Sequence, residues 1–338
     1  MWSKDAPKCP GIETPYIISM TGIHISVVHN FNKRRQTDGE NTEGVNDGHG
    51  HPQYQTLVAV NCNVLVAETE ANGVYNYLGT IGIEEAERIK QLEYNLPGSV
   101  QRIVGGFDVV SAVVPYQAGL IIDLSLERQA ICGGVIIAFN RILTAAHCND
   151  DGVNTAESIT VVVGSEYIFI GGVRETVLSA VMHPEYDPKT IANDVAVLRI
   201  PGLRFVYNIQ PVSLPTGNEL NQTYEGVYGR ASGFGIRRDG GSMQLYQSLH
   251  MAILRVISNA ECRSVYGDVV QDSHVCTSGA GRIGICKGDT GGPLVGTLIS
   301  TVIFQIGIGS FTSSRGCQAG APSGFTRITS FVPWIMSV

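Results

Sequence analysis

The chain has 338 residues and a formal net charge of -7, with 16% charged residues, 43% hydrophobic residues and 40 glycines. The hydrophobic content excludes wholesale disorder, and the composition is not that of a coiled coil. Because the net charge is negative, we expect no nucleic-acid partner. No uninterrupted apolar run reaches roughly 18 residues, so we expect no membrane-spanning helix.

Residues 1–55 have no assigned role and are expected to form a disordered extension, because the stretch 30–53 is polar and has no apolar period. Residues 56–67, TLVAVNCNVLVA, are similar to a degenerate signal-peptide core, but the residues after Met1 do not form a convincing secretory leader. A start codon assigned too far upstream and a genuine, unusual extension both explain this arrangement.

The segment 82–94, GIEEAERIKQLEY, predicts a short helix that ends before Pro97-Gly98. Its apolar residues recur at helical spacing, with Glu and Lys on the other side: Ile83, Ala86, Ile89 and Leu92.

From residue 103 onward, short β-rich runs recur between turns that contain Gly, Asn, Asp and Pro. Examples are VVPYQAGLIIDL, SITVVVGSEYIFIGG, SLHMAILRVI and TLISTVIFQIGIGSF. This regular spacing predicts an all-β barrel or sandwich. Residues 327–336, RITSFVPWIM, predict a short terminal helix.

Eight cysteines lie at positions 9, 62, 132, 148, 262, 276, 286 and 317. None forms a CxxC pair, which argues against zinc-ribbon and thioredoxin patterns. An even, scattered set in a strand-rich region favours disulfides and an oxidising compartment. Free buried thiols in a cytosolic protein are the alternative.

Three segments supply the parts of an acyl-transfer relay: LTAAHC with His147, NDVAVLRI with Asp194, and CKGDTGGPL with Thr290. In such a relay the hydroxyl attacks, the imidazole takes its proton, and the carboxylate orients the imidazole. The glycines beside Thr290 allow backbone N–H groups to converge on a developing oxyanion. Each segment alone is a weak signal, since each fits an ordinary turn or cap. Together, in this order, they are specific for nucleophilic catalysis.

With RIVGG at 102–106, CGGVII at 132–137 and GDTGGPLV at 288–295, the chain resembles the chymotrypsin-like serine protease family, and most of all its insect digestive members. The resemblance covers residues 103–338. It implies an all-β domain of two six-stranded antiparallel barrels with a short C-terminal helix and the relay between them. GIEEAERIKQ is similar to the activation peptide of the insect branch, so residues 56–102 are expected to hold the signal-like segment and an activation peptide.

The resemblance also implies how the chain is activated. A trypsin-like protease would cut between Arg102 and Ile103, and the new ammonium group of Ile103 would pair with Asp289. That ion pair organises the oxyanion hole and the specificity pocket in the family.

Further roles follow from the same resemblance. The N–H groups of Gly288 and Thr290 would form the oxyanion hole, and the Ser310 hydroxyl would hydrogen-bond the relay carboxylate. The implied disulfides are Cys132–Cys148, Cys262–Cys276 and Cys286–Cys317. Cys9 and Cys62 have no family role.

The specificity pocket is expected to prefer apolar side chains. Gly284 lies where a trypsin-like member has aspartate, so a substrate Lys or Arg would have no partner. Thr312 stands where the family usually has a glycine, which narrows the pocket entrance, and Ser323 lines the other wall.

One residue departs from the family pattern GDSGGP, because Thr290 stands at the nucleophile position. Threonine keeps the hydroxyl but adds a methyl group and restricts χ1, and small misplacements in a relay cost ~10²-fold. Threonine nucleophiles typically use their own N-terminal amine as base, which the internal Thr290 lacks. We therefore predict a protease homologue with crippled or absent activity. The alternative is an active endopeptidase that uses Thr290.

The expected partners are peptide or protein substrates, or protease inhibitors, together with the trypsin-like activator. We expect a secreted, extracellular monomer, with the gut lumen as one location, and neither a metal nor a cofactor. The loop NDDG at 149–152 predicts a solvated turn, with calcium binding as the alternative. Asn221, in NQT, fits the glycosylation acceptor pattern.

Overall fold

The computed structural model of the chain describes residues 18–21, 24–27, 71–72, 74–94, 107–236, 239, 248–297 and 303–338. The chain divides into two units, Met1–Leu65 and Val66–Val338. In the first unit, β1 (Ile18–Thr21) pairs antiparallel with β2 (His24–Val27). The rest of the extension 1–55, the signal-like run 56–67 and the 102–103 junction lie outside the described residues.

The first sheet of the second unit is antiparallel, and its seven strands follow the order β10–β11–β7–β6–β5–β8–β9. Its strands are β5 (Gln117–Leu124), β6 (Arg128–Ala138), β7 (Arg141–Thr144), β8 (Ser158–Val163), β9 (Val173–Thr176), β10 (Ser179–Met182) and β11 (Ala196–Arg199). β5 and β6 are buried along most of their length, because they lie at the centre of the largest hydrophobic core.

The second sheet follows the order β12–β15–β16–β17–β14–β13–β4, and an additional β12–β13 pairing closes six of its strands into a barrel. Its strands are β4 (Phe107–Asp108), β12 (Tyr228–Gly233), β13 (His250–Ile257), β14 (His274–Thr277), β15 (Pro293–Thr297), β16 (Ile303–Ser313) and β17 (Ser323–Arg327). A two-residue strand, β3 (Ala71–Asn72), pairs with the end of β16.

The expected all-β fold is confirmed, with one difference in detail. The second sheet closes as a six-stranded barrel, whereas the first is a curled sheet whose edge strands β9 and β10 do not pair with each other among the described residues. Instead, the link between them bonds to the strands next to the two edges: Val177 N donates to Ile159 O on β8, and Leu178 N donates to Arg199 O on β11. Residues 177–178 therefore span the gap between β9 and β10, and no ladder of hydrogen bonds joins these two strands.

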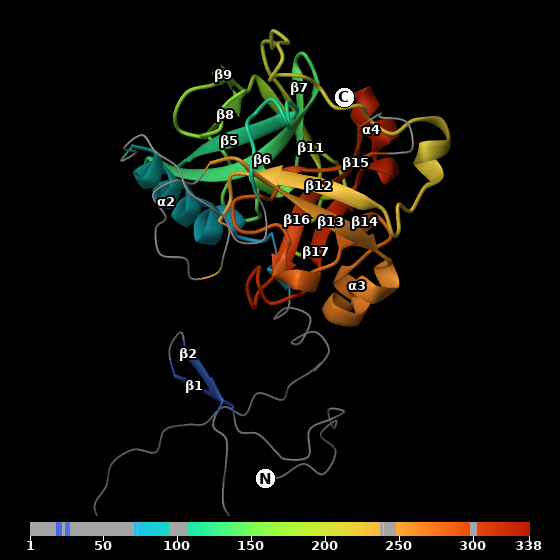
Figure 1. The fold of residues 1–338 in the computed structure, drawn as a ribbon. Coiled ribbons are helices and arrows are strands. Elements are labelled where there is room, and N and C mark those ends of the chain that lie inside the picture. Colours follow the sequence, from blue (N-terminus) through green and yellow to red (C-terminus); the bar gives the residue numbers. More distant parts are fainter. Residues whose placement is uncertain are drawn as a thin grey trace, which may run out of the picture. The chain divides into compact units, whose positions relative to one another are not determined.

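In the part of the chain that the structure describes, three α-helices lie around the sheets (Figure 1). They are α2 (Ile83–Tyr94), which follows the π-helical turn η1 (Leu78–Gly82), α3 (Asn259–Tyr266) and α4 (Val332–Ser337). Short 3₁₀ turns are η2 (Ala146–Cys148), η3 (Gly217–Asn221), η4 (Gly267–Val269), η5 (Ala280–Arg282) and η6 (Ile328–Ser330). Within the described residues, no helix is long and apolar enough to cross a membrane.

The helix predicted at 82–94 is confirmed as α2. The terminal helix begins five residues later than expected, at Val332, because a 3₁₀ turn precedes it and Pro333 occupies its first turn, where proline is tolerated. Helix α3 was not predicted from the sequence. Its start is set by Ser258, whose side chain accepts a hydrogen bond from Glu261 N.

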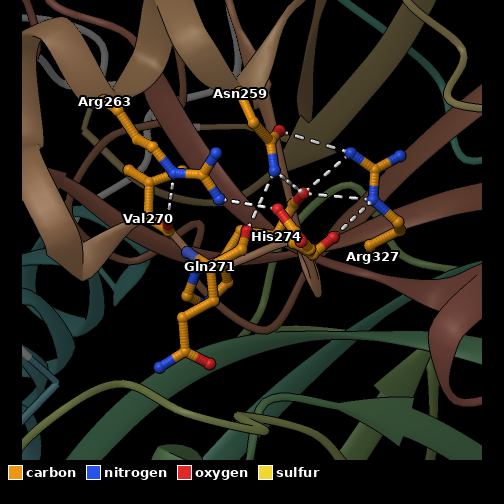
Figure 2. Close-up of polar contacts among 7 residues, drawn as sticks. Asn259, Arg263, Val270, Gln271, His274 and Arg327 are labelled. Atoms are coloured by element: carbon orange, nitrogen blue, oxygen red, sulfur yellow. Dashed lines mark hydrogen bonds and ion pairs between the residues drawn. The ribbon is translucent and has the colours of Figure 1, made fainter.

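A polar cluster joins α3 to the second barrel (Figure 2). Arg327 on β17 donates to the carbonyl oxygens of His274 and Asp272 and to Asn259 Oδ1. Arg263 on α3 donates to Val270 O. These bonds satisfy the carbonyl groups of the loop that the Cys262–Cys276 disulfide closes, so the loop is held from both sides.

Candidate active site

His147 and Asp194 meet in the interior of the molecule, and both side chains are fully buried. His147 lies on η2, directly after β7, and Asp194 lies two residues before β11, the strand that pairs with β7. His147 Nδ1 lies 2.9 Å from Asp194 Oδ2, and His147 N donates to Asp194 Oδ1 at 3.0 Å. With a proton on Nδ1, this contact leaves Nε2 as the basic nitrogen.

The Asp194 carboxylate has a second partner besides His147, a hydroxyl group. Ser310 on β16 donates to Asp194 Oδ2 at 2.6 Å, and Thr326 donates to the Asp194 backbone carbonyl at 2.7 Å. Burial opposes ionisation of Asp194, but the charge of His147 and the hydrogen bonds from His147 and Ser310 outweigh it, so its pKa lies below the ordinary value. The carboxylate therefore stays ionised and orients the imidazole.

Thr290 lies in the glycine-rich turn before β15 and is 5% exposed. Its backbone is fixed on one side by the hydrogen bond from Gly133 N to Thr290 O, at 2.7 Å. Its hydroxyl oxygen Oγ1 and His147 Nε2 are both buried and are not hydrogen-bonded to each other. The structure thus contains the His147–Asp194–Ser310 part of the relay without a link from the imidazole to the hydroxyl.

The turn itself depends on glycine at two positions. Gly288 has φ +90° and Gly291 has φ +81°, a region that L side chains rarely adopt. A Cβ atom at Gly291 would lie 2.4 Å from Gly133 O and 2.5 Å from Thr144 Oγ1. This close packing fixes the backbone on both sides of Thr290.

Asp289 is buried beside the same turn. Its carboxylate accepts hydrogen bonds from Gly235 N at 2.8 Å and Cys286 N at 3.0 Å, and His250 Nε2 lies 3.6 Å from its Oδ2. Its expected partner Ile103, and the Arg102 that precedes it, lie outside the described residues.

Two of the three residues expected to line the specificity pocket, Gly284 and Ser323, face each other. A Cβ atom at Gly284 would lie 2.5 Å from Ser323 Oγ, so these two positions face each other closely. Ile285 N donates to Ser323 Oγ at 3.2 Å. Thr312 is 7% exposed and lies on β16, two residues after Ser310.

Disulfides support this arrangement. The structure joins Cys132 to Cys148, Cys262 to Cys276, and Cys286 to Cys317. The first links β6 to the residue after His147, and the third links the turn before Thr290 to the segment after β16.

Sequence reasoning missed one residue at the site, Tyr77. Its ring makes an edge contact with the His147 ring at a centroid distance of 4.8 Å, and its hydroxyl donates to Ile131 O at 3.4 Å. Burial raises the Tyr77 pKa far above its ordinary value, while the Thr290 hydroxyl and the Gly288 N–H, which both face the phenol oxygen, oppose the rise. No motif signals this contact, because Tyr77 lies 70 residues before His147 and outside the segments that resemble the family.

The loop after His147 also differs from expectation. Asp151 is fully buried, so the solvated-turn interpretation is wrong for this residue. Its carboxylate accepts hydrogen bonds from Val153 N and Asn154 N within the loop and from Leu78 N at 2.7 Å.

Comparisons with known proteins agree with this geometry. The model of the trypsin family matches residues 103–335. The collagenase of Hypoderma lineatum is 36% identical over 235 residues, which cover 69% of this chain and 86% of that protein. Brachyurin of Leptuca pugilator is 34% identical, with 70% and 97% covered, and chymotrypsin of Phaedon cochleariae is 34% identical, with 70% and 81% covered. A solved structure of HL collagenase superposes with a TM-score of 0.63 at 35% identity, covering 70% of this chain and 97% of that one.

Proposed function

Since the chain belongs to the trypsin family of chymotrypsin-like serine proteases, we propose that it is a secreted homologue, made as a zymogen, whose peptidase activity is crippled by Thr290. The observation that carries the proposal is Thr290 itself, a β-branched side chain at the nucleophile position of a site whose other relay contacts are present.

The proposed chemistry is acyl transfer from a peptide to a hydroxyl. His147 Nε2 would take the hydroxyl proton, and Asp194, kept ionised, would hold the imidazole and stabilise its charge. The N–H groups of Gly288 and Thr290 would stabilise the oxyanion. Thr290 limits this reaction, because its branched Cβ restricts the rotamers that aim Oγ1 at the base. A side chain in the wrong rotamer leaves the base and the oxyanion donors without a nucleophile between them.

An apolar substrate preference follows from the pocket positions. Gly284 brings no charge, and the neighbouring Ser323 Oγ leaves little room for a larger side chain at that position. The substrates would be peptides or proteins cut after small or medium apolar residues, because Thr312 would narrow the pocket entrance. The alternative, an active endopeptidase that uses Thr290 directly, is tested by the same assay as the crippled state.

Secretion is supported by the three disulfides, which persist in oxidising compartments. The zymogen proposal rests on Arg102 before Ile-Val-Gly-Gly. Limited trypsin treatment followed by N-terminal sequencing should give a new chain that starts at Ile103. A dominant cut elsewhere, with the bond after Arg102 intact, would count against it.

The test of crippled activity compares the trypsin-cleaved wild type with Thr290→Ser on apolar peptide esters. Serine removes the methyl group and keeps the hydroxyl, so we expect a rate increase of at least about 10²-fold. Thr290→Ala is the matched control, because it also removes the methyl group but lacks the hydroxyl, and it should show no gain. Brisk wild-type turnover that His147→Ala abolishes would establish the active-enzyme alternative.

A further inference from the structure

Residues 71–72 and 74–94 lie upstream of the family match and fold over the relay; we call them the cover segment. We propose that the cover segment is a built-in peptide inhibitor that occludes the His147–Thr290 site and stays bound there after the Arg102–Ile103 bond is cut. The proposal goes beyond the loss of activity above, because it concerns access to the relay and holds for either residue at position 290.

The cover segment begins as an added strand. β3 pairs antiparallel with the end of β16, with Asn72 opposite Thr312 and Ala71 opposite Ser313. Strand addition to an exposed edge is a common mode of peptide binding. Because Ser310 lies on the same strand, β3 runs beside the element that supports the relay carboxylate.

The chain then turns inward over the site. Val74 is 1% exposed and packs in one cluster with Ile191 and Phe311. Tyr77 N donates to Val74 O at 3.1 Å, which closes a turn, and the turn aims the Tyr77 ring at His147. The group beside His147 and Thr290 is therefore a phenol, which has no carbonyl for a nucleophile to attack. A ligand of this kind blocks the site and is not consumed by it.

The loop after His147 holds the turn in place. Leu78 N donates to the buried Asp151 carboxylate at 2.7 Å, and Asn76 N donates to Asp151 O at 3.0 Å. Asn154 Nδ2 donates to Asn76 Oδ1 at 2.9 Å. This is the function that the structure supports for the buried carboxylate of Asp151.

Helix α2 anchors the other end on the first sheet. Ala86 and Ile89 are 1% and 0% exposed within the largest core, and a Cβ atom at Gly82 would lie 2.8 Å from Ala130 Cβ on β6. At the end of the helix, the Glu93 carboxylate accepts hydrogen bonds from Ile168 N and Phe169 N.

None of these contacts involves residue 102, so cleavage after Arg102 removes none of them. The segment is held at β3, at the turn, at the Asp151 loop and along α2. Release must therefore follow cleavage as a separate step.

The test uses the full chain cleaved by trypsin after Arg102. Gel filtration with mass spectrometry reports whether the N-terminal fragment remains bound. Reaction of His147 with diethylpyrocarbonate, resolved by peptide mapping, reports access to the relay without any need for catalysis. His183, which is partly exposed and lies outside the cover segment, serves as the internal control.

Two pairs of variants isolate the docking contacts. Ile89→Asp places a charge in the core and Glu93→Lys removes the acceptor of two N–H groups, whereas Tyr94→Asp and Glu87→Lys make the same changes at exposed positions of α2. We expect the wild type and the exposed variants to retain the fragment. The buried variants should lose the fragment and label His147 at least about tenfold faster. Burying an unpaired charge costs more free energy than a tenfold change in an equilibrium constant represents.

A further variant keeps the test independent of helix docking. Tyr77→Ala in the uncleaved chain should raise His147 labelling and leave His183 labelling unchanged. Dissociation of the wild-type fragment on cleavage, or equal His147 labelling in all variants, would overturn the proposal. Neither fragment retention nor His147 labelling requires Thr290 to act as a nucleophile. A failure of this proposal is therefore distinct from a failure of the proposed loss of activity.

Discussion

The nucleophile turn depends on individual glycines, and Gly291 is the one with the least room. Gly291→Ala introduces a Cβ atom 2.4 Å from a backbone oxygen, in a left-handed conformation. Gly226→Ala is the matched control, since it has φ +80° but nothing within 4 Å of its Cβ. We expect the control to lose about 1–2 kcal/mol from backbone strain alone, and Gly291→Ala to lose clearly more in urea unfolding. Equal losses would show that the turn can open around the methyl group.

Ser310 tests the support of the relay carboxylate. Ser310→Ala removes a 2.6 Å hydrogen bond to a buried, ionised group, so the free energy of unfolding should fall by about 1–3 kcal/mol. Ser264→Ala removes a hydrogen bond of the same length on the exposed face of α3 and should cost less than about 0.5 kcal/mol.

The same variant should change the response to acid. Because the folded-state pKa of Asp194 lies below its ordinary value, its contribution is full above about pH 4 and is lost as the pH falls. Without the Ser310 hydroxyl that pKa rises, so the acid unfolding midpoint should shift to higher pH. An unchanged acid midpoint would mean that His147 alone holds the carboxylate.

At the scale of elements, α2 carries a pH dependence. Burial raises the pKa of Glu93 to about 7, although the N–H groups of residues 168–170 and the charge of Arg174 oppose the rise. Glu85, on the same helix, is shifted in the same direction by burial, against its ion pair with Arg88. The docked helix therefore binds protons more tightly than the released helix. Docking is strongest below about pH 4.5, weakens as the pH rises towards 7, and is weakest above it.

The dissociation constant of the cleaved fragment should accordingly rise by up to roughly 10²-fold between pH 5 and pH 8, so that less of the fragment is retained. Gel filtration of the cleaved protein across this range measures it. Glu93→Gln, which has no proton to exchange, should flatten most of the profile. A profile that Glu93→Gln leaves unchanged would assign the pH dependence to another group.

The elements that sequence could predict are those with strong local patterns. β5, β8 and β13 follow apolar runs between turns, and α2 follows a helical period, so each forms where its pattern indicates. Helix α3 is too short to show a clear helical period in the sequence, and its start depends on a single cap at Ser258. The sheet closure through the 177–178 link leaves no local signal, because it depends on two distant strands.

At the scale of the whole molecule, the motifs bring His147 and Asp194 together because β7 and β11 are neighbours in the same sheet. Their contact follows from the fold that the motifs indicate. The Tyr77 contact does not, because the cover segment lies outside those motifs and docks through contacts that no motif marks, such as the Tyr77 ring on His147 and Leu78 N on Asp151. The two proposals together place control of activity at two levels, the residue at position 290 and the cover segment.

Hydrolysis of one apolar peptide ester by four trypsin-cleaved proteins tests this account most directly: wild type, Thr290→Ser, Ile89→Asp and the double variant. The account predicts feeble turnover in the wild type and in Ile89→Asp, partial rescue in Thr290→Ser, and the highest rate in the double variant, at least about 10²-fold above Ile89→Asp alone. Turnover by Ile89→Asp as fast as that of the double variant, and abolished by His147→Ala, would contradict it, because Thr290 would then serve as a competent nucleophile.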